Sequence, residues 1–277
     1  MLRLFFLLLL PIFFSFSKEV ILTTTYPLYY PVKFMAEGRY RVEVLLEKEA
    51  DPHHYELKPS DIKRLKGSKA LFYLGVEGWE TKLVKANPSK AYPLAKGLNL
   101  IKSGKFYDPH VWMSPKAYEG LVENAYRALM ELDPAGKGEY TVKKDEFLQK
   151  LRQLDKRYGE VLKTCKSKTV VITHQSLSYL ARDYGLNVVG IRGVHAEEEP
   201  KPSEIKKLLQ TLQKLPVKSL FYELGQDKSL AESIAKQANA TVVLLNTSLM
   251  PQEPGDDYFS IMERNLRALA TGLGCKY

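Results

Sequence analysis

The chain has 277 residues, of which 45% are hydrophobic and 26% are charged, enough for a sizeable core and for two domains of ordinary size. It carries 41 Lys and Arg residues against 32 Asp and Glu residues, a formal net charge of +9. Basic and acidic residues are interleaved along predicted helix faces, as in KPSEIKKLLQTLQKL, which indicates solvated surfaces and argues against a nucleic-acid partner.

Residues 1–17, MLRLFFLLLLPIFFSFS, predict a secretory signal peptide. One Arg precedes an apolar run that is shorter than the roughly 20 residues needed to cross a bilayer, so an uncleaved anchor is the less favoured alternative. Small residues, Ser15 and Ser17, stand before the charged Lys18. We expect cleavage near Ser17 and a periplasmic mature protein. No cysteine lies near that site to accept a lipid.

Seven short β-rich runs fall into two blocks. They lie at 20–25, 42–46 and 70–74 in the first block and at 169–173, 187–191, 219–223 and 241–246 in the second. Most are continuous apolar runs, which is typical of parallel strands buried on both faces. Helix-like segments separate many of them, including 60–66 and 203–215, for which Ser60 and Ser203 are the expected N-caps. The pattern predicts an α/β fold of two lobes, each a mainly parallel sheet flanked by helices.

One long amphipathic helix is predicted between the blocks, over 140–162. Its apolar residues recur at spacings of three, four and seven, and the turn-forming sequence DPAGKG precedes it. We expect a rigid helix that bridges the lobes, with an ordinary helix inside one domain as the alternative. The expected divisions are the signal peptide at 1–17, a first lobe at 18–138, the connecting helix at 139–165 and a second lobe at 166–277.

Cys165 and Cys275 are the only cysteines. They are too few and too far apart in sequence for a zinc–thiolate site. Export favours a disulfide between them, and two unpaired thiols remain an open alternative.

The histidines are concentrated in two segments that both begin with Asp-Pro, DPHHYELKP at 51–59 and DPHVWMSP at 108–115. His53 follows the second predicted strand, His110 lies in a loop after the third, and His174 directly follows the run at 169–173. Ligands of parallel α/β sheets bind beyond the carboxyl ends of the strands, and neutral imidazole suits zinc and similar ions. We therefore predict a shared metal site, although each histidine alone could be structural.

Several segments resemble solute-binding proteins of zinc and manganese ABC importers, the ZnuA/TroA-like family. DPHHYELKPSD with KALFYLGVEGWE is similar to the first metal-ligand segment of that family, DPHVWMSP to the second and THQSLSYLARDYGL to the third. The long helix and the closing GDDYFSIMERNLRAL also match. The resemblance implies two metal-binding lobes with one ion in the cleft. It further implies Zn²⁺ as transported cargo rather than catalytic cofactor, a monomer, and delivery to a membrane permease.

The resemblance assigns the metal ligands to His53, His110 and His174. The third position tends to be His in zinc binders and Glu in manganese or iron binders, so His174 implies zinc, with a manganese or iron binder as the alternative. The family often has an Asp after the last strand of the second lobe, where this chain has Asn246. The fourth ligand is therefore expected to be water, Asn246 or Glu223.

Other polar residues near the motifs receive lesser roles. His54 and His195 are expected to be exposed, and Asp51 and Asp108 are expected to stabilise turns or orient imidazoles. Three histidines with an open fourth position also describe a catalytic zinc, for which Glu223 could be the base. An exported zinc hydrolase is therefore an alternative, and an adhesin, which leaves the histidines unexplained, is a third.

Overall fold

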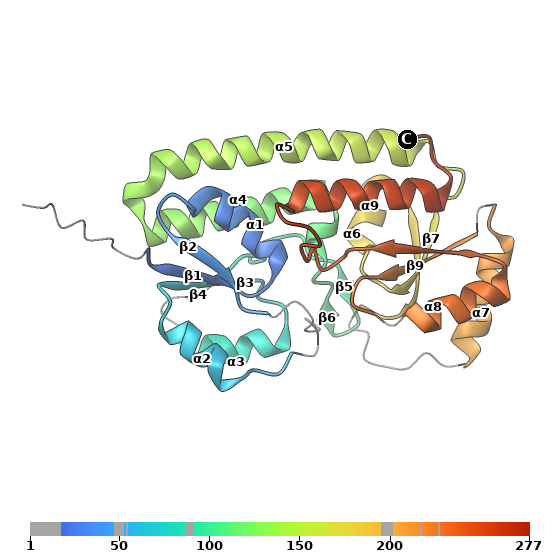
Figure 1. Cartoon of the computed structure of the whole chain (residues 1–277), viewed down its shortest axis with the longest axis horizontal. Helices are drawn as coiled ribbons and strands as arrows, with labels where there is room; N and C mark the ends of the chain where they lie inside the picture. The colour runs from blue at the N-terminus through green and yellow to red at the C-terminus, as the bar shows by residue number, and fades with distance from the viewer. Residues whose placement is uncertain are drawn as a thin grey trace, which may run out of the picture.

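The computed structural model describes residues 18–46, 53, 55–86, 91–194, 202–216, 218–226 and 228–277. Two four-stranded sheets lie one beside the other along the long axis of the molecule, and one long helix runs above both (Figure 1). Within the described ranges, no helix has the length and apolarity that a membrane span requires. The signal peptide at 1–17 and the expectations for Asp51, His54 and His195 lie outside the described residues and stay predictions.

The first sheet is parallel throughout, in the order β2-β1-β3-β4. Its strands are β1 (Val20–Thr23), β2 (Arg41–Val44), β3 (Ala70–Tyr73) and β4 (Ala91–Pro93), and the helices between them are α1 (Tyr26–Ala36), α2 (Pro59–Lys66) and α3 (Gly78–Ala86). The sequence predicts the first three strands but not β4, an edge strand of three residues that ends in proline. The helix at 60–66 is confirmed, but its N-cap is Lys58 and not Ser60.

The second sheet is also parallel, in the order β10-β9-β7-β8. Its strands are β7 (Thr169–His174), β8 (Asn187–Arg192), β9 (Ser219–Glu223) and β10 (Thr241–Leu245), accompanied by α6 (Ser178–Tyr184), α7 (Pro202–Lys214), α8 (Lys228–Ala238) and α9 (Tyr258–Leu273). All four predicted strands are confirmed to within one residue. The predicted helix at 203–215 is confirmed as α7, although Ser203 lies inside its first turn rather than at the cap.

The long helix α5 (Lys137–Lys163) confirms the predicted connector and extends over 27 residues, about 40 Å. It follows α4 (Pro115–Leu132) and the short 3₁₀ helix η3 (Pro134–Gly136). Its buried face packs on α1 and α4 at one end and on α9 at the other, where the Tyr158 hydroxyl donates to the Met262 carbonyl at 2.7 Å. The helix therefore belongs to the packing of both lobes.

The hydrophobic core is continuous between the lobes only on the side of α5. One cluster contains Phe72 from the first sheet, Phe221 from the second and Leu151 from α5. On the opposite faces, two separate clusters pack α2 and α3 against the first sheet and α7 and α8 against the second. The lobes therefore share one core on the side of α5 and have separate cores on their opposite faces.

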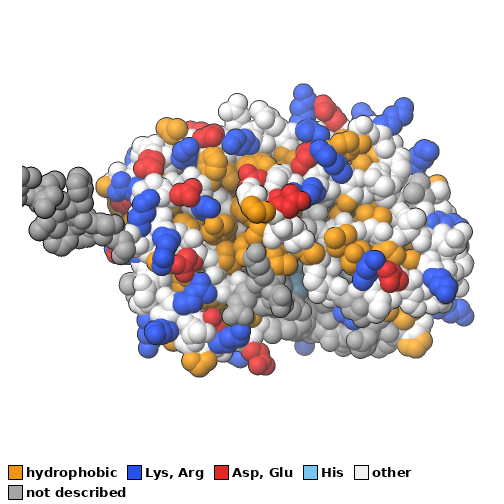
Figure 2. Space-filling model, viewed as in Figure 1, with side chains coloured by type: hydrophobic (Ala, Val, Ile, Leu, Met, Phe, Trp, Pro, Cys, Tyr) orange, Lys and Arg blue, Asp and Glu red, His pale blue; other side chains and the backbone are white. Residues whose placement is uncertain are grey.

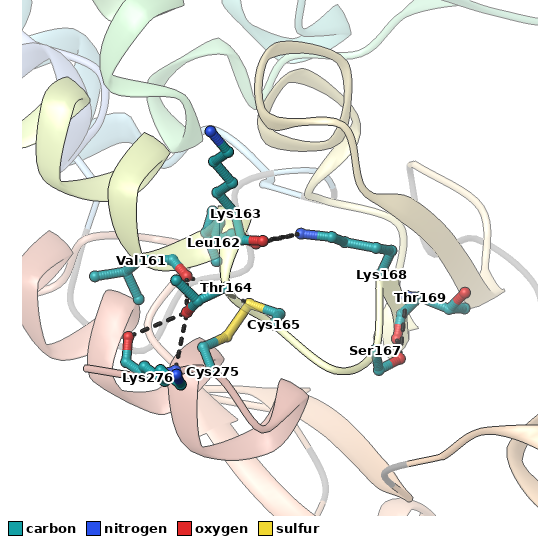
Figure 3. The surroundings of a disulfide bond; sticks show 10 residues. All are labelled: Val161, Leu162, Lys163, Thr164, Cys165, Ser167, Lys168, Thr169, Cys275 and Lys276. Carbon is teal, nitrogen blue, oxygen red and sulfur yellow. Dashed lines mark hydrogen bonds between the residues drawn. A yellow bond between two sulfur atoms is a disulfide. The ribbon is translucent and has the colours of Figure 1, made fainter.

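A disulfide joins Cys165, just after α5, to Cys275, just after α9, so the open question from the sequence is resolved as a disulfide (Figure 3). Beside it the Thr164 hydroxyl accepts from the Lys276 backbone N–H at 2.9 Å, and Lys168 donates to the Leu162 carbonyl at 2.5 Å. These contacts fasten the end of α5 to the end of the chain and to the start of β7.

A small antiparallel hairpin, β5 (Lys102–Ser103) and β6 (Phe106–Tyr107), leads from the first lobe to His110. The sequence does not predict it, because two-residue strands carry no periodic signal. After it the chain enters the 3₁₀ helix η2 (Val111–Met113) and then α4.

Candidate metal centre

Three histidines from distant parts of the chain meet at the carboxyl ends of the parallel strands. His53 follows β2, His110 immediately precedes η2, and His174 is the last residue of β7. Their ring centroids are 5.0 to 5.1 Å apart, and one ring nitrogen of each lies within 4.8 Å of the other two. A histidine surface is visible in the crevice between the two halves in Figure 2. Within the described part of the chain, this is the one group of histidine, cysteine or carboxylate side chains arranged to hold a metal ion.

Each imidazole is held from behind by a buried carboxylate. The contacts to the three Nδ1 atoms are 3.1 Å from Glu77 to His53, 2.8 Å from Asp108 to His110 and 2.7 Å from Glu223 to His174. A carboxylate accepts a hydrogen bond from the Nδ1–H group, fixes the ring plane and leaves Nε2 as the nitrogen that can face an ion. The cluster therefore has the donor set of a metal site, with each ring held by its own carboxylate.

Asp108 shows how the Asp-Pro-His sequence builds one of these pairs. Its Oδ1 accepts both from the His110 backbone N–H at 2.9 Å and from the His110 ring, and its carbonyl accepts from the Tyr179 hydroxyl at 2.6 Å. The expectation that Asp108 orients an imidazole is confirmed. Its Oδ2 is buried and has no hydrogen-bond partner.

His53 is anchored through the segment that follows it. The Tyr55 ring lies in the small core of the first lobe against Trp79, 5.2 Å between centroids, and its hydroxyl donates to Asp61 at 2.8 Å. Asp61 also accepts from the Lys58 backbone N–H at the start of α2. The segment from Tyr55 to Asp61 is therefore docked on the first lobe close behind His53 in the chain.

Glu77 is a site residue that sequence reasoning missed. Its signal is its position: it stands just beyond the carboxyl end of β3, where polar residues of a parallel sheet face a ligand. The adjoining turn is fixed by Glu80, which accepts from Thr24 Oγ1 at 2.7 Å and from the backbone N–H groups of Leu74 and Gly75. Complete burial raises the pKa of Glu80 to about 7, against the hydrogen bonds that lower it.

Both ring nitrogens of His174 are engaged. Nδ1 faces Glu223, and Nε2 lies 2.7 Å from the Val194 carbonyl oxygen. Because both neighbours are hydrogen-bond acceptors, this geometry is that of a ring protonated on both nitrogens. Burial lowers the pKa of His174, but Glu223 and the Val194 carbonyl outweigh it and raise the pKa above 6.5. For His110, burial is the stronger influence and lowers the pKa below 6.5 despite Asp108.

The two candidates for a fourth ligand have other partners in this structure. Glu223 uses one oxygen on His174 and the other on the Ser176 hydroxyl. The Asn246 side chain donates to the Met250 carbonyl at 2.7 Å and accepts from the Met250 backbone N–H at 3.1 Å, which closes its own loop. The identity of the fourth ligand stays a prediction.

The charge around the three imidazoles is negative. Glu77, Asp108 and Glu223 are at most 6% exposed, and together they can carry three negative charges in a poorly solvated place, of which a doubly protonated His174 compensates one. Buried charge of one sign is costly unless a counter-ion compensates it. A divalent cation bound to the imidazoles is such a counter-ion.

The molecule has two parallel α/β lobes, a helix common to both and a histidine cluster in the cleft. These features define the class of two-lobed binding proteins with a candidate metal site. Residues 21–272 match the family described as ZnuA, zinc-uptake complex component A, periplasmic. The chain belongs to this family.

Individual relatives agree with this assignment. The chain is 28% identical over 286 residues to the zinc-binding protein AdcA of Streptococcus pyogenes, covering 91% of this chain but only 56% of the relative. It is 29% identical to the high-affinity zinc uptake system protein ZnuA of Bacillus subtilis, covering 93% of this chain and 88% of the relative. The solved laminin-binding protein Lmb of Streptococcus agalactiae, described as a bifunctional protein with adhesin and metal-transporting activity, is 29% identical, with a TM-score of 0.85 over 93% of this chain and 100% of the other. This chain spans little more than half of the length of AdcA.

Proposed function

We propose that the protein captures Zn²⁺ in the cleft between its lobes, through His53, His110 and His174, and delivers the ion to the permease of an ABC importer. The observation that carries the proposal is the convergence of three imidazole nitrogens to within 4.8 Å, each ring backed by its own carboxylate. The family description and the names of the relatives in S. pyogenes and B. subtilis support zinc as the cargo.

The donor set favours zinc on chemical grounds. Three neutral nitrogen ligands suit a borderline ion in tetrahedral coordination, and one further ligand, water or a side chain, completes the four. The carboxylates behind the rings raise the basicity of the imidazoles and compensate the charge of the ion without ligating it. Manganese prefers carboxylate oxygens and would gain less from this arrangement.

Capture requires a local rearrangement at His174. Its Nε2 must lose a proton and exchange the Val194 carbonyl for the ion, because a protonated nitrogen has no lone pair to donate. The lobes themselves are already connected near the cleft. Trp112 donates to the Thr247 carbonyl at 2.7 Å, and the Tyr30 hydroxyl donates to the Leu249 carbonyl at 2.8 Å. We therefore expect loading to move side chains and loops more than whole lobes.

A zinc hydrolase is the weaker alternative. The carboxylate that such an enzyme would use as a base, Glu223, has both oxygens occupied by His174 and Ser176. The family to which the chain belongs is described as a zinc-uptake component. A screen of the zinc-loaded protein for ester, amide and phosphate hydrolysis distinguishes the two, and turnover that depends on Glu223 would favour the enzyme.

The ligand assignment is tested by titration of zinc-free protein with Zn²⁺ in competition with a chelator of known affinity. His53→Ala, His110→Ala and His174→Ala should each weaken binding by a factor of ten or more, about 1.4 kcal/mol. His54→Ala and His195→Ala, at positions that the sequence predicts to be exposed, are the matched controls and should change affinity little. Equal loss in His195→Ala and His174→Ala would show that the assignment is wrong.

A further inference from the structure

A separate cavity of about 330 Å³ borders His174 at the carboxyl end of the second sheet. Its polar lining comes from the ends of β7 and β8, the turn after β9 and the first turns of α8, and consists of Thr173, Arg192, Gln226, Ser229 and Ser233 beside His174. None of the described residues in its wall is an aspartate or a glutamate. The nearby Glu223 is turned towards His174 and Ser176.

The Thr173 side chain is a buried hydroxyl that lacks a partner. The residue is 7% exposed, and its Oγ1 makes no hydrogen bond. A buried polar group without a partner costs free energy, so such groups in folded proteins call for an explanation. A ligand in the cavity that accepts from Thr173 removes this cost.

The other polar groups of the wall are donors suited to an anion. Arg192 pairs with His174 in the register of β7 and β8, and its guanidinium has five N–H donors, so it can serve a ligand together with its other contacts. Ser229 and Ser233 are four residues apart on α8 and share one face of the helix. They stand at its amino-terminal half, the positive side of the helix dipole.

We propose that this cavity binds a small oxyanion, a carboxylate or a phosphate, beside the metal centre. Guanidinium and hydroxyl donors are the groups that recognise such anions. The volume is at the lower end of small-molecule sites and admits a small acid rather than a peptide. The anion site stands on its own geometry, whereas any coupling to zinc through the shared His174 rests on the proposed function.

Calorimetric titration of zinc-free protein with citrate and, separately, with inorganic phosphate tests the site in a buffer that contains chloride as its only other anion. Saturable one-to-one binding of at least one probe is expected, and the two arms distinguish a carboxylate from a phosphate ligand. Thr173→Val removes the hydroxyl with little change of shape and should weaken binding about fivefold. Arg192→Gln should weaken it at least about tenfold. Thr211→Val, which makes the same change on α7, is the matched control.

Absence of saturable binding for both probes overturns the proposal, and so does binding that Thr173→Val and Arg192→Gln leave unchanged. If Arg192→Gln fails to fold, Thr173→Val and Ser233→Ala carry the test. A zinc titration without citrate or phosphate is run in parallel and tests the proposed function alone. If the protein binds the anion but not zinc, the anion site stands and the proposed function is wrong. If it binds zinc but neither anion, the proposed function stands and the anion site is wrong.

Discussion

At the scale of single residues, the site is a set of imidazole–carboxylate pairs rather than three isolated ligands. The sequence identifies the imidazoles because they stand in short motifs at strand ends. It identifies only one of the carboxylates as a partner, Asp108, since that residue is two positions from its histidine. Glu77 and Glu223 reach their histidines across 24 and 49 residues of chain, and local sequence carries no such information.

The pairing predicts an effect for a residue that does not touch the ion. Glu77→Gln keeps a hydrogen-bond acceptor for His53 Nδ1 but removes the negative charge, so zinc affinity should fall about tenfold, the lower end for such partners. Glu77→Ala should cost more, because the ring also loses its orientation. Competition titration measures both, with Glu56→Gln, an acid in the exposed segment before α2, as the control. Wild-type affinity in Glu77→Ala would refute the positioning role.

Metal preference is predicted to depend on His174 and Asn246 together. Replacing them by Glu and Asp, respectively, adds two oxygen ligands and removes one nitrogen, so the double variant should lose zinc affinity relative to manganese. Titration of wild type, both single variants and the double variant with each ion gives the ratio directly. A wild-type protein that prefers manganese would contradict the zinc assignment.

At the scale of elements, the patterns that the sequence shows well are those with many residues. The 27-residue α5 and the five- and six-residue strands of the second sheet agree with their predicted ranges. The sequence did not predict the shortest strands, the three-residue β4 and the two-residue β5 and β6. It also assigned the N-caps of two helices wrongly, to Ser60 and Ser203. Ends of elements depend on neighbours in space, so a serine next to a proline is an ambiguous cap signal.

The disulfide between the ends of α5 and α9 is predicted to stabilise the fold without influencing the metal. It closes a loop with a sequence separation of 110, for which chain entropy gives about 4 to 5 kcal/mol. The site lies at the other end of β7, roughly 17 Å away along a strand of six residues. The double variant Cys165→Ser with Cys275→Ser should therefore unfold at lower denaturant concentration but bind zinc within about twofold of wild type. A large loss of zinc affinity in the folded variant would contradict this separation.

At the scale of the whole molecule, the proposed ion would link two lobes that share a core only beneath α5. His53 belongs to the first lobe and His174 to the second, so we expect zinc to bind the folded, assembled cleft and not the unfolded chain. Zinc at a thousandfold excess over its dissociation constant should raise the free energy of unfolding by about 4 kcal/mol. Differential scanning calorimetry of zinc-free and zinc-loaded protein measures the gain, and His174→Ala should show little of it. Equal melting temperatures for both wild-type forms at neutral pH would refute a specific site.

The same gain is predicted to depend on pH. Zinc requires deprotonated Nε2, and the pKa of His174 is raised above 6.5 by Glu223 and Val194 against its burial, so protons compete at a higher pH than for an ordinary histidine. The stabilisation by zinc should be complete well above that pKa and fade as the pH falls through it. In zinc-free protein the sign is opposite, because a raised pKa favours the folded state at low pH and this contribution is lost as the pH rises through the folded-state pKa. Calorimetry in steps from pH 8 to pH 5, with and without zinc, separates the two trends.

The sequence by itself determined the α/β class, the two blocks of parallel strands, the long α5 and the three histidines. Each of these is written in local patterns: apolar runs, helical periodicity, and Asp-Pro-His turns. The tertiary structure decided that Cys165 and Cys275 pair, that Glu77 and Glu223 orient His53 and His174, and that the Asn246 side chain closes its own loop. Most of these contacts join residues that are far apart in the chain. In the remaining case, Asn246, one side chain could have bonded several different partners. Their geometry is set only when the lobes pack around a common core.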